Sequence, residues 1–151
     1  MFNYEELNYL ISGAGEISIE ELRKFSRYSG YTLEHPTIQA FWNVVFNFNE
    51  EEKSNLLMFV TSCPRPSFLG FEDLSPPFTI AKNGNSLDSL PISHTCGNVL
   101  ELPDYRNEEL LRIKLLMAIN SKSGFELAWI YSHDHTHIIF IFILYSKMEK
   151  N

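Results

Sequence analysis

Cys96 is the residue of this sequence best suited to chemistry, and it lies in a predicted polar loop that runs from Leu90 to Asn98 between two predicted strands. A cysteine in such a segment can attack as a thiolate, and the flanking His94, Thr95 and Asn98 can donate or accept hydrogen bonds beside it. The alternative is a structural role, because free cysteine is often a small core residue. From the residues alone, both a nucleophile and a buried cysteine remain open.

Two other groups of residues could carry chemistry, and we expect neither to do so. Cys63 stands before Pro64 at the end of a predicted helix, a setting that favours a buried structural cysteine. His133, His135 and His137 would share one face of an extended chain and could bind a metal ion there. Only one carboxylate lies among them, so we expect no metal site, and nothing in the sequence calls for a cofactor.

Composition limits the function classes. The chain has 151 residues, of which 44% are hydrophobic and 14% aromatic, as expected for one folded domain. Its net charge of −7 argues against nucleic acid as a partner, since backbone binding needs clustered cations. The apolar run from Ile138 to Tyr145 has eight residues, whereas a spanning helix needs about 20, so we expect no membrane insertion. Two cysteines and no signal peptide favour an intracellular, reducing compartment.

The N-terminal third of the chain reads as helical. Short helices are predicted over residues 5–11 and up to Phe25, the second opened by Ser18 with Glu21 three residues later, which is a capping-box pattern. A connector follows and ends at Pro36. Helical spacing of apolar residues then predicts two helices within residues 38–60, with a break at 47–49.

The rest of the chain mixes strands and one helix. Strands are predicted at 78–81 and 99–102, and a helix capped by Asn107 is predicted up to Ile119, with Gly124 just past its end. Together these elements predict an α+β fold with a small mixed sheet packed against helices.

Several ordered blocks of the sequence resemble the HECT-type ubiquitin-protein ligases. The active-site signature of that family resembles Leu90-Pro91, His94-Thr95-Cys96, Asn98, Leu100, Leu102-Pro103 and Tyr105. Further similar blocks are Phe59 to Pro66, Leu69-Gly70-Phe71, Lys114 to Ile119 and Gly124 to Leu127. The Ser62-Cys63 pair and the Phe-Glu-Leu ending look most like the subgroup whose longer members carry an IQ motif.

The resemblance implies a reaction. Cys96 would accept ubiquitin from a ubiquitin-conjugating enzyme as a thioester and pass it to lysines of protein substrates, leading to polyubiquitination and ubiquitin-dependent degradation. His94, Thr95 and Asn98 would position the reacting groups, and Phe125 would assist ligation. No cofactor is implied, and the expected location is the cytoplasm, with the nucleus as a second compartment.

The resemblance also implies a division of the chain. Residues 1–29 would be a helical remnant of the HECT N-terminal lobe, 30–36 the hinge, 37–128 the C-terminal lobe and 129–151 an atypical hydrophobic and His-rich tail. The conjugating enzyme would bind the missing part of the N-terminal lobe, so the chain would be a fragment.

Two departures from the family stand out. Gly97 occupies a position where the family more often has a larger residue, and the chain continues well past Phe125. Two alternative functions remain. One is a non-catalytic ubiquitin-interacting module, and the other is a small cysteine hydrolase or redox protein, which the absence of a Cys-x-x-Cys pair disfavours.

Overall fold

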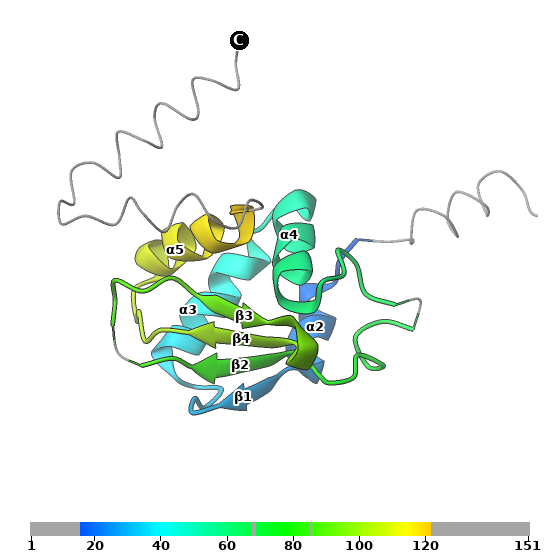
Figure 1. Ribbon diagram of the computed structural model, residues 1–151, viewed down its shortest axis with the longest axis horizontal. Helices are drawn as coiled ribbons and strands as arrows, with labels where there is room; N and C mark the ends of the chain where they lie inside the picture. Colours follow the sequence, from blue (N-terminus) through cyan, green and yellow to red (C-terminus); the bar gives the residue numbers. More distant parts are fainter. Residues whose placement is uncertain (1–15, 68, 85, 122–151) are drawn as a thin grey trace, which may run out of the picture. The chain divides into compact units, whose positions relative to one another are not determined.

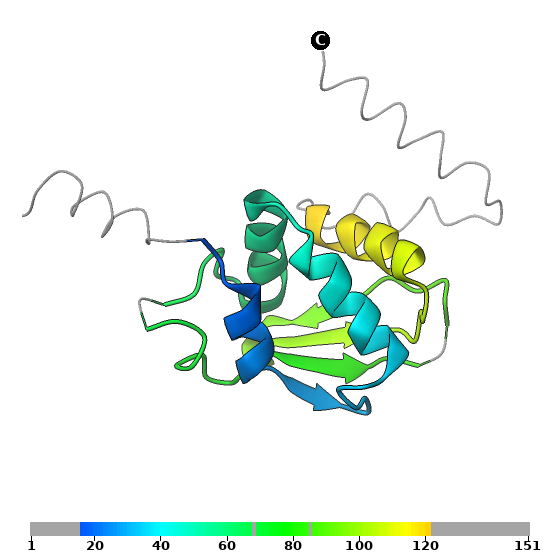
Figure 2. The same cartoon turned by 180° about the vertical axis from the view of Figure 1, so that it is seen from behind.

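The computed structural model describes residues 16–67, 69–84 and 86–121, which form a four-stranded sheet with helices on one face (Figures 1 and 2). The elements in chain order are α2 (Ile19–Phe25), β1 (Arg27–Ser29), α3 (Pro36–Phe46), α4 (Glu50–Thr61), β2 (Thr79–Lys82), β3 (Ile92–His94), the 3-10 turn η1 (Thr95–Gly97), β4 (Val99–Leu102) and α5 (Glu108–Asn120). The predicted α+β class is confirmed. The predicted helix at 5–11, Gly124, Phe125, the three alternating histidines and the tail lie outside the described residues.

The sheet is mixed. Its strand order is β1-β2-β4-β3, with β1, β2 and β4 parallel and β3 antiparallel to β4. Because side chains alternate along a strand, Ile80, Leu100 and Leu102 point to the helical layer and are fully buried. Glu101 points to the opposite face, which Figure 1 shows without a covering helix.

Side-chain caps fix where the helices begin. At α4, Asn49 accepts from the Glu52 backbone amide and the Glu52 carboxylate accepts from the Asn49 amide, both at 2.9 Å. At α2, Ser18 accepts from the Glu21 amide at 3.2 Å. The predicted reciprocal box at Ser18 is wrong, because the Glu21 carboxylate instead accepts the backbone amide of Phe71 at 3.1 Å.

Two further helices, α5 and α3, also begin at a side chain that accepts a hydrogen bond from a backbone amide of the first turn. Asn107, the predicted cap of α5, accepts from the Leu110 amide at 2.9 Å. At α3, the His35 ring accepts from the Thr37 amide at 3.2 Å, and Pro36 occupies the first turn, where a missing N–H costs nothing. The predicted break at 47–49 is confirmed, since α3 ends at Phe46 and α4 begins at Glu50.

Strand β1 was not foreseen by the sequence analysis. Residues 27–29 stand between a predicted helix and a predicted connector, yet they pair with residues 79–81 of β2. The preceding α2 buries Ile19 and Leu22 in the same hydrophobic core as α3, α4 and α5. The elements before residues 30–35, α2 and β1, therefore pack into the same sheet and hydrophobic core as the elements after them.

Candidate active site

Cys96 is exposed and occupies the middle of η1, the turn that joins β3 to β4. The structural alternative of a buried cysteine is thereby excluded for this residue. The expectation of a loop throughout 90–98 needs correction, because residues 92–94 form β3 and residues 95–97 form η1. The thiol is thus carried on a short turn between two paired strands, at the end of the sheet where segment 62–78 also lies (Figures 1 and 2).

Asn98 holds this turn in place. Its backbone lies in the left-handed region with φ 51°, which asparagine tolerates better than most residues. Its buried side chain donates to the Pro76 carbonyl at 2.7 Å, and its own carbonyl accepts from the Thr79 amide at 2.9 Å. Asn98 therefore ties the turn that carries Cys96 to the start of β2.

His94 ends β3, two residues before Cys96, and its Nε2 lies 3.1 Å from Oε1 of Glu101 in β4. In the register of the two strands, His94 faces Val99, so Glu101 is its diagonal neighbour on the uncovered face. Sequence reasoning missed Glu101. Only recognition of the three-residue strand β3 could have found it, because a tight turn at 95–98 between paired strands places residues 94 and 101 diagonally on one face.

Thr95 opens η1 and is exposed. Its carbonyl oxygen accepts from the Asn98 amide at 3.4 Å, which closes the turn. Within the described residues its hydroxyl has no hydrogen-bond partner. Thr95, Cys96 and Asn98 are thus brought together by the turn, whereas Phe125 lies outside the described residues.

Gly97 is not demanded by the backbone, because its φ lies outside the left-handed region that favours glycine. A Cβ at this position would meet only the Val99 Cγ2 methyl, at 3.3 Å, among atoms within 4 Å. The turn can therefore carry a side chain at 97 after a small movement of Val99. The space beside Cys96 is therefore open because residue 97 is a glycine, and the backbone of the turn does not require it.

Cys63 is exposed, so the expectation of a buried cysteine is wrong. It follows Ser62, whose left-handed backbone (φ 60°) ends α4. The Thr61 hydroxyl accepts from the Cys63 amide at 3.2 Å. Both cysteines of the chain are thus accessible thiols, and Cys63 is a matched reference for Cys96.

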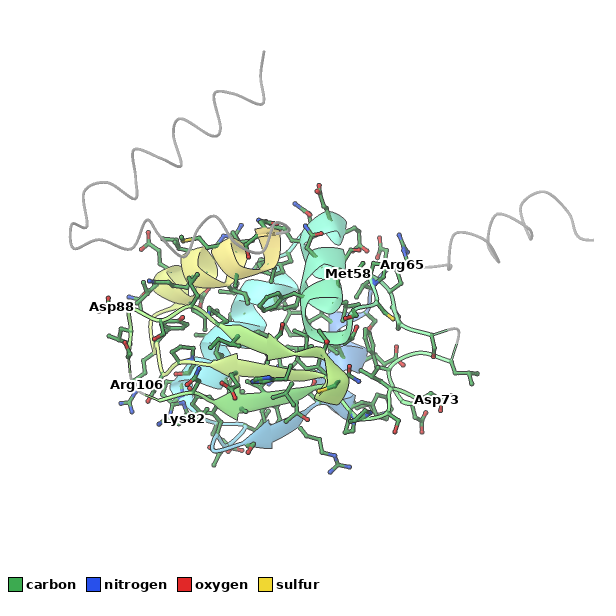
Figure 3. All side chains as sticks on the ribbon, viewed as in Figure 1. Met58, Arg65, Asp73, Lys82, Asp88 and Arg106 are labelled. Carbon is green, nitrogen blue, oxygen red and sulfur yellow. The ribbon has the colours of Figure 1, made fainter. Side chains whose placement is uncertain are left out.

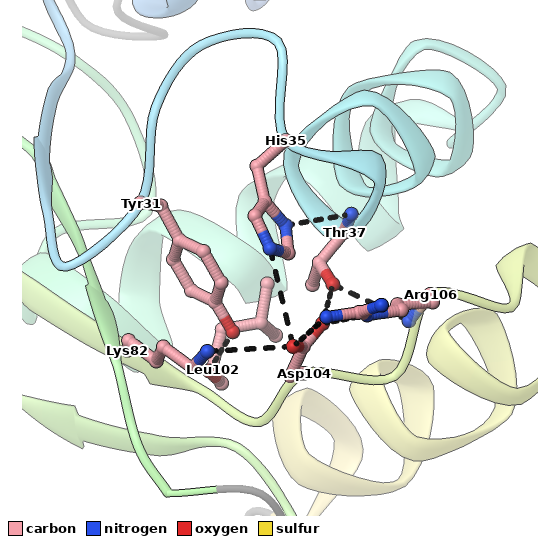
Figure 4. A network of polar contacts seen from close by, with 7 residues as sticks. All are labelled: Tyr31, His35, Thr37, Lys82, Leu102, Asp104 and Arg106. Atoms are coloured by element: carbon pink, nitrogen blue, oxygen red, sulfur yellow. Dashed lines mark hydrogen bonds and ion pairs between the residues drawn. The ribbon is translucent and has the colours of Figure 1, made fainter.

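A second polar cluster lies at the other end of the sheet, centred on the buried carboxylate of Asp104 (Figure 4). It accepts from Thr37 at 2.6 Å, from Arg106 at 3.1 Å through two nitrogens, and from Lys82 at 3.4 Å. These contacts, with Arg106 the largest, hold the pKa of Asp104 far below its usual value. Burial and, second, the Asp104 charge raise the pKa of the nearby Tyr31 to about 12.

This cluster is structural and separate from the turn at Cys96. Figure 3 shows Lys82 and Arg106 at one end of the domain, and Arg65 and Asp73 beyond the other. Its groups satisfy one another, because the Tyr31 hydroxyl also donates to the Leu102 carbonyl at 2.7 Å. The cluster joins the chain before α3 to the chain after β4.

Metal ions and membranes are the remaining kinds of partner to consider for the part of the chain that the structure describes. That part contains no group of three or more His, Cys, Asp or Glu side chains suited to hold a metal ion. None of its helices combines the length and apolar character that crossing a membrane requires.

The comparison with protein families decides what kind of domain carries this turn. Residues 1–128 match the HECT domain, described as a ubiquitin-transferase. This chain belongs to the HECT family. The α+β fold and the family resemblance inferred from its sequence blocks are thereby confirmed, while assignment to the IQ-motif subgroup stays a prediction.

Curated HECT ligases share this region. E3 ubiquitin-protein ligase HUL5 of Saccharomyces cerevisiae is 47% identical over 129 residues, covering 85% of this chain and 14% of that protein. E3 ubiquitin-protein ligase UPL6 of Arabidopsis thaliana is 42% identical over 135 residues, covering 85% of this chain and 13% of that protein. E3 ubiquitin-protein ligase ptr1 of Schizosaccharomyces pombe is 43% identical over 134 residues, covering 85% of this chain and 4% of that protein. The chain thus spans a small part of each of these relatives.

Proposed function

We propose that this chain transfers ubiquitin through a thioester on Cys96. The Cys96 thiolate attacks the carbonyl carbon of a donor thioester, the donor thiolate leaves, and ubiquitin is bound to Cys96 by a new thioester. A lysine amine then attacks that carbonyl, an amide forms, and Cys96 leaves as a thiolate. The exposed thiol on a turn held between paired strands is the observation that carries the proposal.

The physical requirements of this exchange are modest. Donor and product are both thioesters, so the free-energy change is small, and the protein must mainly supply orientation and an accessible thiolate. The hydrogen bonds of Asn98 to Pro76 and Thr79 supply the orientation by fixing the turn. Segment 62–78 lies at the same end of the sheet and would border the approach of the donor (Figure 1).

We propose ubiquitin, a ubiquitin-conjugating enzyme and substrate proteins as partners, with polyubiquitination and degradation of the substrate as the outcome and the cytoplasm, with the nucleus second, as the location. Proximity supplies much of the rate of such transfers. The conjugating enzyme would be recruited by the N-terminal lobe of the HECT domain. The chain alone should therefore load slowly from a charged conjugating enzyme.

Two boundaries compete for the start of the C-terminal lobe. The sequence analysis placed the hinge at 30–36. The packing of Ile19 and Leu22 in the shared core, and the pairing of β1 with β2, support a start near Ile17. We propose the earlier boundary, with residues before it belonging to the N-terminal lobe.

The central test separates the two exposed cysteines. The chain is mixed with ubiquitin carrying a C-terminal thioester to a small thiol, which needs no docking surface. Wild type and Cys63→Ala should each form one adduct that a reducing thiol cleaves. Cys96→Ala, which keeps only Cys63, should form no such adduct in the same time. Cys96→Ser should give an ester that resists thiols and yields to hydroxide.

A second arm tests the partner. Charged conjugating enzyme is supplied to the chain alone and to the chain fused behind the N-terminal lobe of HUL5, and the fusion should load about a hundredfold faster or more, given typical effective concentrations. An adduct that persists in Cys96→Ala refutes the site. Ubiquitin binding by an intact chain that never forms an adduct supports the non-catalytic module instead.

A further inference from the structure

The uncovered face of the sheet carries an acid–base pair beside the proposed nucleophile. His94 closes β3, and Cys96 follows it by two residues in η1. Consecutive Cα atoms are about 3.8 Å apart, so the Cα atoms of these two residues can be separated by about 7.6 Å at most. Chain connectivity alone therefore keeps the backbone of His94 close to that of Cys96.

The carboxylate of Glu101 fixes one side of that imidazole. Its Oε1 lies 3.1 Å from His94 Nε2, and an ionised carboxylate only accepts, so Nε2 must carry the proton of this contact. In the neutral ring, Nδ1 is then the unprotonated nitrogen. Within the described residues Nδ1 has no hydrogen-bond partner, so it is free to accept a proton.

The strand register holds the pair in place without help from the turn. Ile92 faces Glu101 and His94 faces Val99, so the carboxylate comes from the strand adjoining the histidine and from the same face. The side chain of His94 is 52% exposed and that of Glu101 is 33% exposed, so the pair is open to solvent on this face of the sheet. Both side chains are accessible to an incoming lysine.

We propose that Glu101 is a positioning residue that holds His94 as the proton acceptor for the lysine step. This role rests on the proposed function. The neutral lysine amine attacks the thioester carbonyl, the carbon–nitrogen bond forms, and the carbon–sulfur bond breaks to release the Cys96 thiolate. The proton lost by nitrogen goes to His94 Nδ1 and from there to water.

The role is specific to the second half of the reaction. Loading of Cys96 exchanges one thiolate for another and releases no amine proton, so it should not depend on the pair. Discharge to lysine releases a proton and should depend on it. Removal of Glu101 leaves the ring free to rotate and to change tautomer, which lowers the fraction of productive encounters.

The experiment compares loading and discharge in the same preparations. Wild type, Glu101→Ala, Glu101→Gln, His94→Ala and the His94→Ala/Glu101→Ala double variant are loaded with ubiquitin from the small-thiol thioester and then given free lysine. All should load within about twofold of wild type. Discharge should fall about a hundredfold in His94→Ala, at the lower end of acid–base contributions, and by a smaller factor of about ten in Glu101→Ala. The double variant should lose no more than His94→Ala does.

Two comparisons separate positioning from charge or stability. Glu101→Gln keeps an oxygen that accepts from Nε2 and should recover most of the discharge rate. Glu109→Ala removes the same charge from an exposed position in the first turn of α5 and should leave loading and discharge unchanged. Nitrogen-15 spectra of the His94 ring should show the Nε2-protonated tautomer in wild type and a tautomer mixture in Glu101→Ala.

The outcomes distinguish this role from the proposed function. A wild-type chain with no thioester on Cys96 refutes the proposed function, whereas a loading chain whose discharge is unaffected by Glu101→Ala refutes the role of Glu101 alone. Additive losses in the double variant, or an Nδ1-protonated ring in wild type, would also overturn it.

Discussion

The side-chain amide of Asn98 donates a 2.7 Å hydrogen bond to the carbonyl oxygen of Pro76, joining the turn that carries Cys96 to the segment before β2. Asn98 is buried, and its backbone is left-handed. One residue thus combines a conformational requirement with a hydrogen-bond requirement, and substitutions can separate the two.

Substitution of Asn98 by alanine should cost more than substitution by glycine. Asn98→Gly loses the bond to Pro76, about 1 kcal/mol, but adopts the left-handed backbone freely. Asn98→Ala loses the bond and also pays about 1–2 kcal/mol for that backbone. Urea unfolding of the three proteins measures both costs. Equal losses in the two variants would show that the backbone of residue 98 is unstrained.

A pair of glycine variants tests the space beside Cys96. Gly97→Ala should change the free energy of unfolding by less than about 0.5 kcal/mol, because the lower conformational entropy of the unfolded alanine variant offsets the contact with Val99. Gly70→Ala should cost about 2 kcal/mol or more, since Gly70 has φ +83° and a Cβ there would overlap the Glu21 carboxylate that binds Phe71. Thermal unfolding checks both. A Gly97→Ala protein as unstable as Gly70→Ala would contradict the open geometry of the turn.

Acid should remove the stabilisation that Asp104 provides. Its pKa is lowered in the folded protein, chiefly by Arg106, so its contribution is complete above the unfolded value of about 3.9 and is lost as pH falls toward the folded value. At pH 7, Asp104→Asn should lower the free energy of unfolding by about 1.5–3 kcal/mol, as for hydrogen bonds to charged groups. The gap between variant and wild type should narrow below about pH 4. A gap independent of pH between 7 and 2.5 would show that the charge is unimportant.

Removal of the residues before the predicted hinge tests where the folded unit begins. A chain starting at Glu16 should unfold cooperatively like the full chain, whereas one starting at Thr37 should not fold, because it loses β1 and the buried Ile19 and Leu22. Circular dichroism during heating distinguishes the two. A stable chain from Thr37 onward would restore the boundary at 30–36.

Truncation at the other end tests the tail. A stop after Ala128 removes the uncharged, β-prone run from Ile138 to Leu144, and we expect higher solubility with an unchanged melting temperature. The measurement is centrifugation followed by thermal unfolding. A clear drop in melting temperature would show that the tail contributes a strand to the fold.

Features set by neighbouring residues were predictable from the sequence. The caps at Ser18 and Asn107 depend on contacts within three residues, and each forms as predicted on the cap side. The strands β1 and β3 have three residues each, too few for a recognisable alternation, and their existence depends on partners elsewhere in the chain. Glu21 was misread for the same reason, because its carboxylate binds an amide 50 residues away.

The site was predictable to a similar extent. Cys96 and its neighbours His94, Thr95 and Asn98 lie on one turn because they are adjacent in sequence. Glu101 was missed because its relation to His94 depends on the strand register. The burial of Cys63 was wrongly predicted from the fact that free cysteines are usually buried, whereas this cysteine is exposed just past the C-terminal cap of α4.

The N-terminal elements α2 and β1 are made long before their partners, and this delay matters during synthesis on the ribosome. Glu21 of α2, for example, binds Phe71, which lies 50 residues later in the chain, and a ribosome adding about 5–20 residues per second needs about 3–10 s to make the residues between them. During that interval the apolar side of α2 and the outer strand β1 are already made but have no sheet to join. Newly made chains should therefore pass through a period in which chaperone binding, and not packing, shields Ile19 and Leu22.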